Sequence, residues 1–282
     1  MTAQTVAPRS TTAPAAAAGR NEERRGKRRE ATRLWAIRAA IAVVFCLLWQ
    51  LASGRLFPVF IISSPSLVVQ RFGQLLHGGE LFVHLGYTMR ACGLGFLIGA
   101  FVGSTLGLAF GIYETVSKVI SPFAAMLYSA PKIMLSPLIV VWVGVDLTMK
   151  VFVAAVSCMW IIFYNVWNAT RRIDRNLLDQ LRLMGASQRQ IIAGLYLPSA
   201  LTWLLISLRV AFPVALIGAV VGEFVASSKG LGYLALDAGQ RYDSAGVIVA
   251  VLTITITATI IDSILAAIQR KVALWQGEGE HG

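Results

Sequence analysis

The sequence predicts an all-α polytopic membrane protein with six transmembrane helices. The first observation is composition, because 56% of the 282 residues are hydrophobic and only 14% are charged. The second is the number of apolar stretches that reach the roughly 20 residues a helix needs to cross a bilayer. We place these spans near residues 34–53, 88–110, 119–143, 148–168, 199–225 and 245–268.

The charge pattern argues against a nucleic-acid partner. The formal net charge is +11, but the basic residues lie at the ends of the apolar spans and in the first 38 residues. That distribution is typical of topology signals and of attraction to anionic lipid headgroups. The three cysteines all lie in apolar stretches, where they behave as small hydrophobic residues and do not suggest a disulfide framework.

The segment before the first span, residues 1–33, is rich in Ala, Thr and Pro and then in charge, and lacks apolar periodicity. We expect it to be a disordered basic tail in the cytoplasm. A cleaved secretory signal is the alternative, but the apolar run is long for one and no small-residue cleavage site follows. The transmembrane domain then covers residues 34–275. The asymmetry of Lys and Arg places both termini, including the tail 276–282, in the cytoplasm.

Two outer connections contain short helices. The sequence SLVVQRFGQLL, residues 66–76, has its apolar residues on one helical face and predicts an interfacial amphipathic helix. The other outer loop contains Gly230 and Gly232, followed by a short apolar helix. Together they can form a platform for a partner that docks from outside.

Glycines recur at every fourth position of the second span. Such a row lets another helix backbone approach closely, which stabilises helix packing in a membrane. Packing within the chain is favoured over a seam between two copies, but the pattern fits both. The row consists of Gly95, Gly99, Gly103, Gly107 and Gly111.

Three charged residues lie in or at the edge of apolar spans and are candidates for the pathway or for structure. Lys132 lies between Pro131 and Pro137, which are expected to break the third span. It can face a pathway, snorkel or cap a freed carbonyl. In the fifth span, Arg209 and Glu223 lie about 21 Å apart along a straight helix, so each needs a partner elsewhere. Pathway and structural roles are both open for these two residues.

The polar insert 171–198 separates the fourth and fifth spans. Its basic start places it in the cytoplasm. An amphipathic helix is expected first, then a sharp turn at Gly185, then a short helix that begins with a capping box at Ser187 and Gln190. Pro198 can open the next span, where its missing N–H costs little. The exposed corner near Gly185 predicts a docking surface for a cytoplasmic partner.

The insert resembles the EAA loop of permease subunits from bacterial ATP-binding cassette importers. Asp179, Gly185 and Pro198 match its spacing, and the remaining matched positions are Leu181, Ala186, Ser187, Leu195 and Leu197. Further segments are similar to the nitrate, sulfonate and taurine branch of that family: PSLVVQRF, APKIMLSPLIVVWVG, LRVAFPVALIGAVVGEF and SKGLGYL. The usual Glu-Ala-Ala opening is replaced by Asp179, Gln180 and Leu181, which affects the ATPase that the loop would fit.

The resemblance implies a type I importer (MetI-like) fold in the bacterial inner membrane, with the EAA loop as a coupling helix. It also implies three partners: cytoplasmic ATPases, a second permease copy in a homodimer, and an extracellular solute-binding protein. No GxxxxGK[ST] phosphate loop occurs in the sequence, so we expect the chain to be a non-catalytic subunit that binds no cofactor. ATP and Mg would be used by the ATPase subunit.

Other functions fit the sequence less well. A secondary transporter or channel would use Lys132, Arg209 and Glu223, but neither inverted repeats nor several intramembrane acids are evident. A membrane enzyme lacks support because the HExxH and GxSxG motifs are absent and the three histidines have no metal-ligand spacing. The family branch and the intramembrane cations favour an anionic solute such as sulfonate, taurine or nitrate, and a pyrimidine-like precursor is the alternative.

Overall fold

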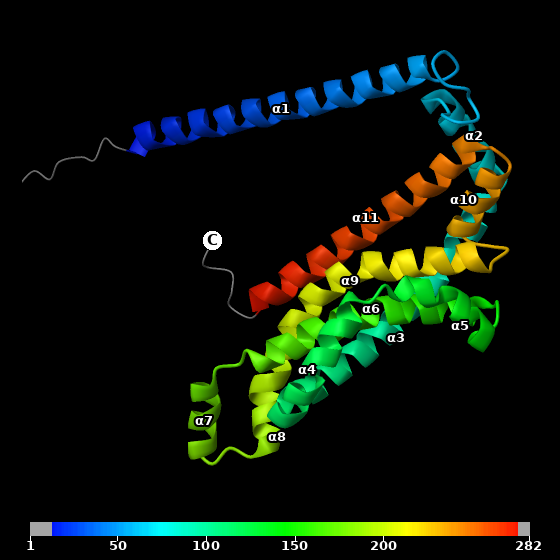
Figure 1. Cartoon of the computed structure of the whole chain (residues 1–282). Coiled ribbons are helices and arrows are strands. Elements are labelled where there is room, and N and C mark those ends of the chain that lie inside the picture. The colour runs from blue at the N-terminus through cyan, green and yellow to red at the C-terminus, as the bar shows by residue number, and fades with distance from the viewer. Residues whose placement is uncertain (1–12, 276–282) are drawn as a thin grey trace, which may run out of the picture. The chain divides into compact units, whose positions relative to one another are not determined.

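The computed structural model describes residues 13–275 (Figure 1). The chain divides into two compact units, Met1–Ser66 and Leu67–Gly282, and each is described by itself. In the first unit, helix α1 (Ala13–Ala52) is followed by a turn at Gly54, whose φ is 79°, and by a single bridge between Ser53 and Phe57.

Helix α1 corrects one expectation. It begins at Ala13, so residues 13–33 are helical, although we expected a disordered tail. Ala, Glu, Arg and Lys dominate this segment and are strong helix formers, so the helix of the first span can extend back through them. Residues 1–12 and the expected tail 276–282 lie outside the described residues.

The second unit is helical throughout its described part. Its elements are α2 (Pro65–His77, from Leu67 on), α3 (Glu80–Ile112), α4 (Glu114–Ser129), the 3-10 turn η1 (Lys132–Leu135), α5 (Ser136–Val143), α6 (Leu147–Arg171), α7 (Arg175–Leu183), α8 (Gln188–Ile191), the π-helical turn η2 (Ile192–Tyr196), α9 (Leu197–Val225), α10 (Leu231–Gln240) and α11 (Ser244–Trp275).

Five helices, rather than six, are long and apolar enough to span a bilayer within residues 13–275. They are Thr32–Ala52, Glu80–Ile112, Leu147–Arg171, Gln188–Val225 and Ser244–Lys271. The expected span 119–143 is divided into α4, η1 and α5. The division has a local cause, because Pro131 follows the end of α4 and cannot supply the N–H that would continue the helix.

Lys132 lies at this break. Its ammonium group donates hydrogen bonds to the carbonyl oxygens of Tyr128 at 2.8 Å and Ala130 at 3.1 Å. These carbonyls are near the C-terminus of α4, where intrahelical donors run out. The side chain therefore caps the end of α4 in this structure.

The core of the second unit is formed by α3, α6 and α9, whose buried residues belong to one hydrophobic cluster. The glycine row of α3 lies against α6. A methyl group added at Gly99 would lie 2.5 Å from Cys158 Sγ, and one at Gly103 would lie 2.5 Å from the carbonyl oxygen of Met159. The row therefore packs the two helices backbone to backbone within the chain.

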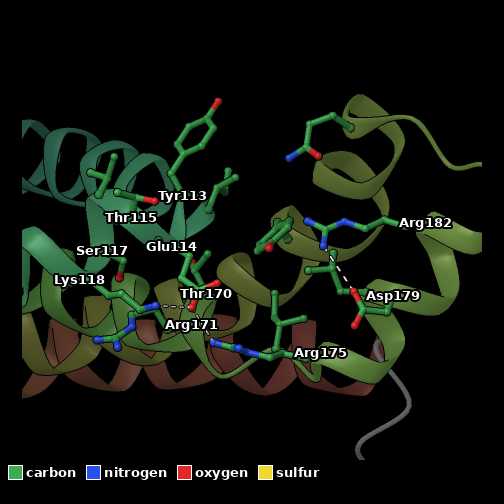
Figure 2. A pocket seen from close by; sticks show the side chains of 17 residues that line it. Tyr113, Glu114, Thr115, Ser117, Lys118, Thr170, Arg171, Arg175, Asp179 and Arg182 are labelled. Atoms are coloured by element: carbon green, nitrogen blue, oxygen red, sulfur yellow. Dashed lines mark hydrogen bonds and ion pairs between the residues drawn. The ribbon is translucent and has the colours of Figure 1, made fainter.

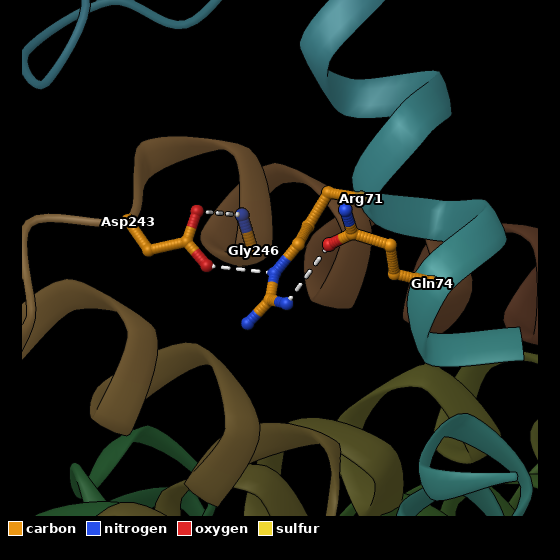
Figure 3. Close-up of polar contacts among 4 residues, drawn as sticks. All are labelled: Arg71, Gln74, Asp243 and Gly246. Atoms are coloured by element: carbon orange, nitrogen blue, oxygen red, sulfur yellow. Dashed lines mark hydrogen bonds and ion pairs between the residues drawn. The ribbon is translucent and has the colours of Figure 1, made fainter. Parts of the chain in front are cut away.

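The amphipathic helix expected at residues 66–76 is α2, and it is tied to the start of α11. Arg71 Nε donates to Asp243 Oδ2 at 2.8 Å, and the backbone N–H of Gly246 donates to Asp243 Oδ1 at 2.9 Å (Figure 3). Gln74 Oε1 accepts a further hydrogen bond from Arg71. One carboxylate thus caps α11 and holds α2, across 172 positions of sequence.

Candidate functional site

The insert forms two short helices around a well-defined turn. Asp174 begins α7 by accepting a hydrogen bond from the backbone N–H of Asn176 at 2.9 Å. At its end, Gly185 has a φ of 82°, and the N–H groups of Gly185 and Ala186 donate to the carbonyls of Arg182 and Leu181. This is the Schellman arrangement, which favours glycine at the left-handed position. The reorientation expected at Gly185 therefore occurs there.

The second short helix, α8, begins with the expected capping box. Ser187 Oγ accepts from the N–H of Gln190, and Gln190 Oε1 accepts from the N–H of Ser187 at 2.8 Å. As expected, Pro198 lies in the first turn of a span-forming helix, because α9 begins at Leu197. The π-helical turn η2 precedes the proline, and in it Leu197 N–H bonds to the carbonyl of Ile192. Such a wider turn can relieve the clash between a proline ring and the preceding turn.

Two apolar residues at the corner of the insert were not singled out from the sequence. Leu183 and Met184 directly precede Gly185, and their exposed fractions are 88% and 83%. The sequence feature that could have indicated them is the pair of adjacent apolar residues at the end of a mostly polar helix. Two adjacent apolar side chains this exposed are available for contact with another protein.

The matched EAA-loop positions fall in three environments. Asp179 is exposed on α7 and pairs with Arg182 at 3.4 Å. Leu181 and Ala186 are half-buried, whereas Ser187 and Gly185 are exposed. Leu195 is half-buried in η2, and Leu197 and Pro198 are exposed on α9. The exposed matched positions before α8 thus lie on α7 and the turn, whereas Leu195 and Leu197 lie where the insert joins the next span.

A groove of about 680 Å³ separates α7 from the start of α4 (Figure 2). Across it, Arg175 Nη2 contacts Glu114 Oε1 at 3.1 Å. Lys118, one turn further along α4, contacts the same oxygen at 2.9 Å. The hydrogen bond from Lys118 and the charge of Arg175 hold the pKa of the Glu114 carboxyl below its ordinary value. Glu114 therefore stays ionised at neutral pH and links α4 to α7.

The second unit contains a buried polar cluster around Glu223, at the start of α10. Three consecutive backbone N–H groups at the start of α10 donate hydrogen bonds to side chains of other helices. Gly230 donates to His84 Nδ1 at 3.0 Å, Leu231 to Thr88 Oγ1 at 2.8 Å and Gly232 to Glu223 Oε2 at 2.8 Å.

Thr88 and Glu223 are fully buried, and Thr88 Oγ1 also donates to Glu223 Oε1 at 2.8 Å. In this structure, Glu223 joins the end of α9 to α3 and α10. Lys150 is also buried, in the first turn of α6, and its ammonium group donates to the carbonyl of Val145.

Arg209 has a partner, Asp262, that was not predicted from the sequence. Its Nε and Nη2 atoms donate to the two carboxylate oxygens of Asp262 on α11, at 2.8 and 3.0 Å. An acidic residue within an apolar span was the signal. Arg209 and Glu223 therefore have separate partners, as their spacing required. Within the described residues, no group of three or more His, Cys, Asp or Glu side chains could hold a metal ion.

A family model described as "Binding-protein-dependent transport system inner membrane component" matches residues 95–274. Curated relatives match most of the chain. One is the permease SsuC of Bacillus subtilis (strain 168), provisionally named for aliphatic sulfonate transport, which is 28% identical over 87% of this chain and 90% of its own length. SsuC of Escherichia coli (strain K12), with the same provisional name, is 30% identical over 86% and 93%.

A third relative has a different printed solute. The riboflavin transport system permease protein RibX of Chloroflexus aurantiacus is 32% identical over 78% of this chain and 82% of its own length. Among solved structures, an inward-facing MetNI methionine transporter chain matches with a TM-score of 0.56 and 24% identity, over 70% of this chain and 96% of that one. An amino acid ABC transporter chain matches with a TM-score of 0.58 and 15% identity, over 71% and 97%. At these identities the structures show a shared fold alone.

Proposed function

The chain belongs to the binding-protein-dependent transport system inner membrane components, and we propose that it carries a small organic anion of the sulfonate class. Membership makes it the permease subunit of an ATP-binding cassette importer, a non-catalytic membrane protein. The proposal for the solute is supported by the two relatives named for aliphatic sulfonates, which align over 87% and 86% of the chain.

For the coupling surface, the carrying observation is the corner formed by Leu183, Met184 and Gly185. It is capped on both sides, by the Schellman turn and by the Ser187 capping box, and it exposes two large apolar side chains. A rigid apolar corner fits a cleft on a cytoplasmic ATPase. The insert then acts as the coupling element, and ATP and Mg bind to the ATPase.

Six crossings are proposed, with α4, η1 and α5 together forming a third, broken crossing. Non-helical backbone is tolerated within a membrane where protein or water covers it, and Lys132 already supplies donors at the break. With six crossings both termini lie in the cytoplasm, in agreement with the Lys and Arg distribution. Two copies of the chain would enclose the pathway, and an extracellular binding protein would deliver the solute.

Uptake by the reconstituted transporter tests the solute. The full chain, its neighbouring-operon ATPase and binding protein are placed in proteoliposomes with ATP inside and supplied with a ³⁵S-labelled alkanesulfonate. We expect ATP-dependent uptake that unlabelled sulfonates inhibit and riboflavin does not. Inhibition by riboflavin alone, or uptake without the ATPase, would contradict the proposal.

Capture of the ATPase tests the coupling surface. Gly185→Trp adds a strained, bulky side chain at the corner, whereas Gly73→Trp adds the same side chain in α2, where nothing lies within 4 Å of an added Cβ. We expect the first variant to insert normally and to lose the ATPase, and the second to retain it. Equal capture by both variants would place the coupling surface elsewhere.

A further inference from the structure

Arg209 and Asp262 lie at a similar depth within two antiparallel spans. Arg209 is about 18 Å along the helix axis from Leu197, and Asp262 is about 14 Å from Lys271, at 1.5 Å per residue. Both distances are measured from the ends that lie toward the cytoplasm in the proposed topology. In a hydrocarbon core of about 30 Å, the pair lies well inside the membrane.

The pair is only partly covered by its own chain, since the side chains are 47% and 38% exposed. Ionised groups within spans are costly in lipid, and they face protein or a water-filled cavity in nearly all cases. The open side of this pair therefore requires water or a second protein surface.

Helix α11 is divided into two adjoining faces near Asp262. One face carries a row of exposed hydroxyl side chains at every fourth position: Thr255, Thr259 and Ser263. Because successive residues are 100° apart around a helix, Asp262 lies on the same side of α11 as this hydroxyl row. Each hydroxyl donates to the carbonyl four residues earlier, at 2.8–2.9 Å, which leaves its oxygen free to accept hydrogen bonds from water. The adjoining face carries a row of exposed isoleucines, Ile256, Ile260, Ile264 and Ile268. A shallow groove of about 530 Å³ runs between the two rows.

We propose that Arg209, Asp262 and the hydroxyl row line the water-filled solute pathway, and that Arg209 contacts the anionic group of the passing solute. The pairing uses Nε and Nη2, so the Nη1 edge of the guanidinium is directed away from Asp262. A neutral ion pair with one outward donor edge attracts an anion weakly. Weak contact suits a pathway, because a solute that binds tightly cannot leave. The contact between Arg209 and the solute rests on the proposed function, which makes the solute an anion. The position of the pathway does not rest on it.

Thiol labelling in the assembled transporter tests the position. Ser263→Cys and Ile264→Cys are made in a Cys46→Ser background, because Cys46 is exposed whereas Cys92 and Cys158 are buried. We expect a water-soluble methanethiosulfonate to react at position 263 at least tenfold faster than at 264. No reaction at 263, or a disulfide between the two copies there, would overturn the inference, because lipid or the second copy would then cover the face.

The charge of the reagent tests the contact without any assumption about the solute. Arg209→Gln leaves Asp262 unpaired, so the ratio of the rates of an anionic and a cationic methanethiosulfonate at position 263 should fall at least threefold. Asp262→Asn should raise that ratio by a similar factor. Unchanged ratios in both variants would overturn the contact.

Transport completes the test. Arg209→Gln should lower sulfonate uptake at least tenfold. Arg209→Lys keeps the charge but not the planar guanidinium group, so its uptake rate should lie between those of Arg209→Gln and the wild type. ATP hydrolysis stimulated by the binding protein should stay within twofold. Wild-type uptake by Arg209→Gln would overturn the role of Arg209. Absence of sulfonate uptake by the wild type, with the labelling results as expected, would refute the proposed solute and leave the pathway in place.

Discussion

Replacing Leu183 and Met184 together by serine should weaken ATPase binding by about 100-fold. Both side chains are at least 83% exposed, so the chain itself loses little packing when they are shortened. Burial of a Leu or Met side chain against a partner is worth about 1.5–3 kcal/mol. If both side chains are covered in the complex, the lower end of that range gives a loss of about 3 kcal/mol, which is about two factors of ten in Kd.

The assay is titration of the detergent-solubilised chain with fluorescent ATPase, together with thermal melting of the chain alone. Val69→Ser in α2 is the matched control, because Val69 is also apolar and 71% exposed but lies outside the insert. We expect the control to bind normally and both variants to melt as the wild type does. A change in Kd of less than threefold in the double variant would refute the assignment of the corner as the coupling surface.

Three further predictions concern contacts within the second unit. Gly103→Leu should destabilise the chain by about 1–3 kcal/mol through overpacking against α6, whereas Gly93→Leu, where nothing lies within 4 Å of an added Cβ, should leave the melting temperature unchanged. Glu223→Ala should cost about 3 kcal/mol, measured by thermal melting in detergent, because the buried Thr88 hydroxyl and the N–H of Gly232 lose their acceptor. Glu223→Gln should cost less; an equal loss would show that charge matters more than hydrogen bonding. Arg71→Ala should speed hydrogen exchange in α2 with little change in melting temperature, because this ion pair is partly exposed and worth at most about 1 kcal/mol.

The sequence alone identified most of the elements and the family. The lengths of the apolar stretches predicted the four later spans that correspond to α3, α6, α9 and α11. Exposed backbone groups are costly in lipid, which leaves few alternatives to a helix. The capping box at Ser187 and the turn at Gly185 were predicted from local hydrogen-bonding rules, and they occur as expected. The resemblance carried by the insert led to the family that the comparisons show.

The errors arose where local rules compete. Pro131 and Pro198 both lack an N–H, yet α4 ends before the first, whereas the second lies in the first turn of α9, directly after η2. A local pattern does not say which outcome applies. The charged segment after Ala13 was expected to be disordered from its composition, although its residues also favour a helix.

Only the tertiary structure decided which charged and polar residues meet. Arg209 with Asp262, Arg71 with Asp243, and the N–H groups of α10 with Glu223 join positions far apart in the chain. The sequence determined that each buried or intramembrane charge needs a partner, because an unpaired charge in a medium of low dielectric constant is costly. It did not determine the partner, because pairing depends on which helix faces approach one another. That approach is set by how the helices pack in three dimensions, as where the glycine row of α3 lies against α6.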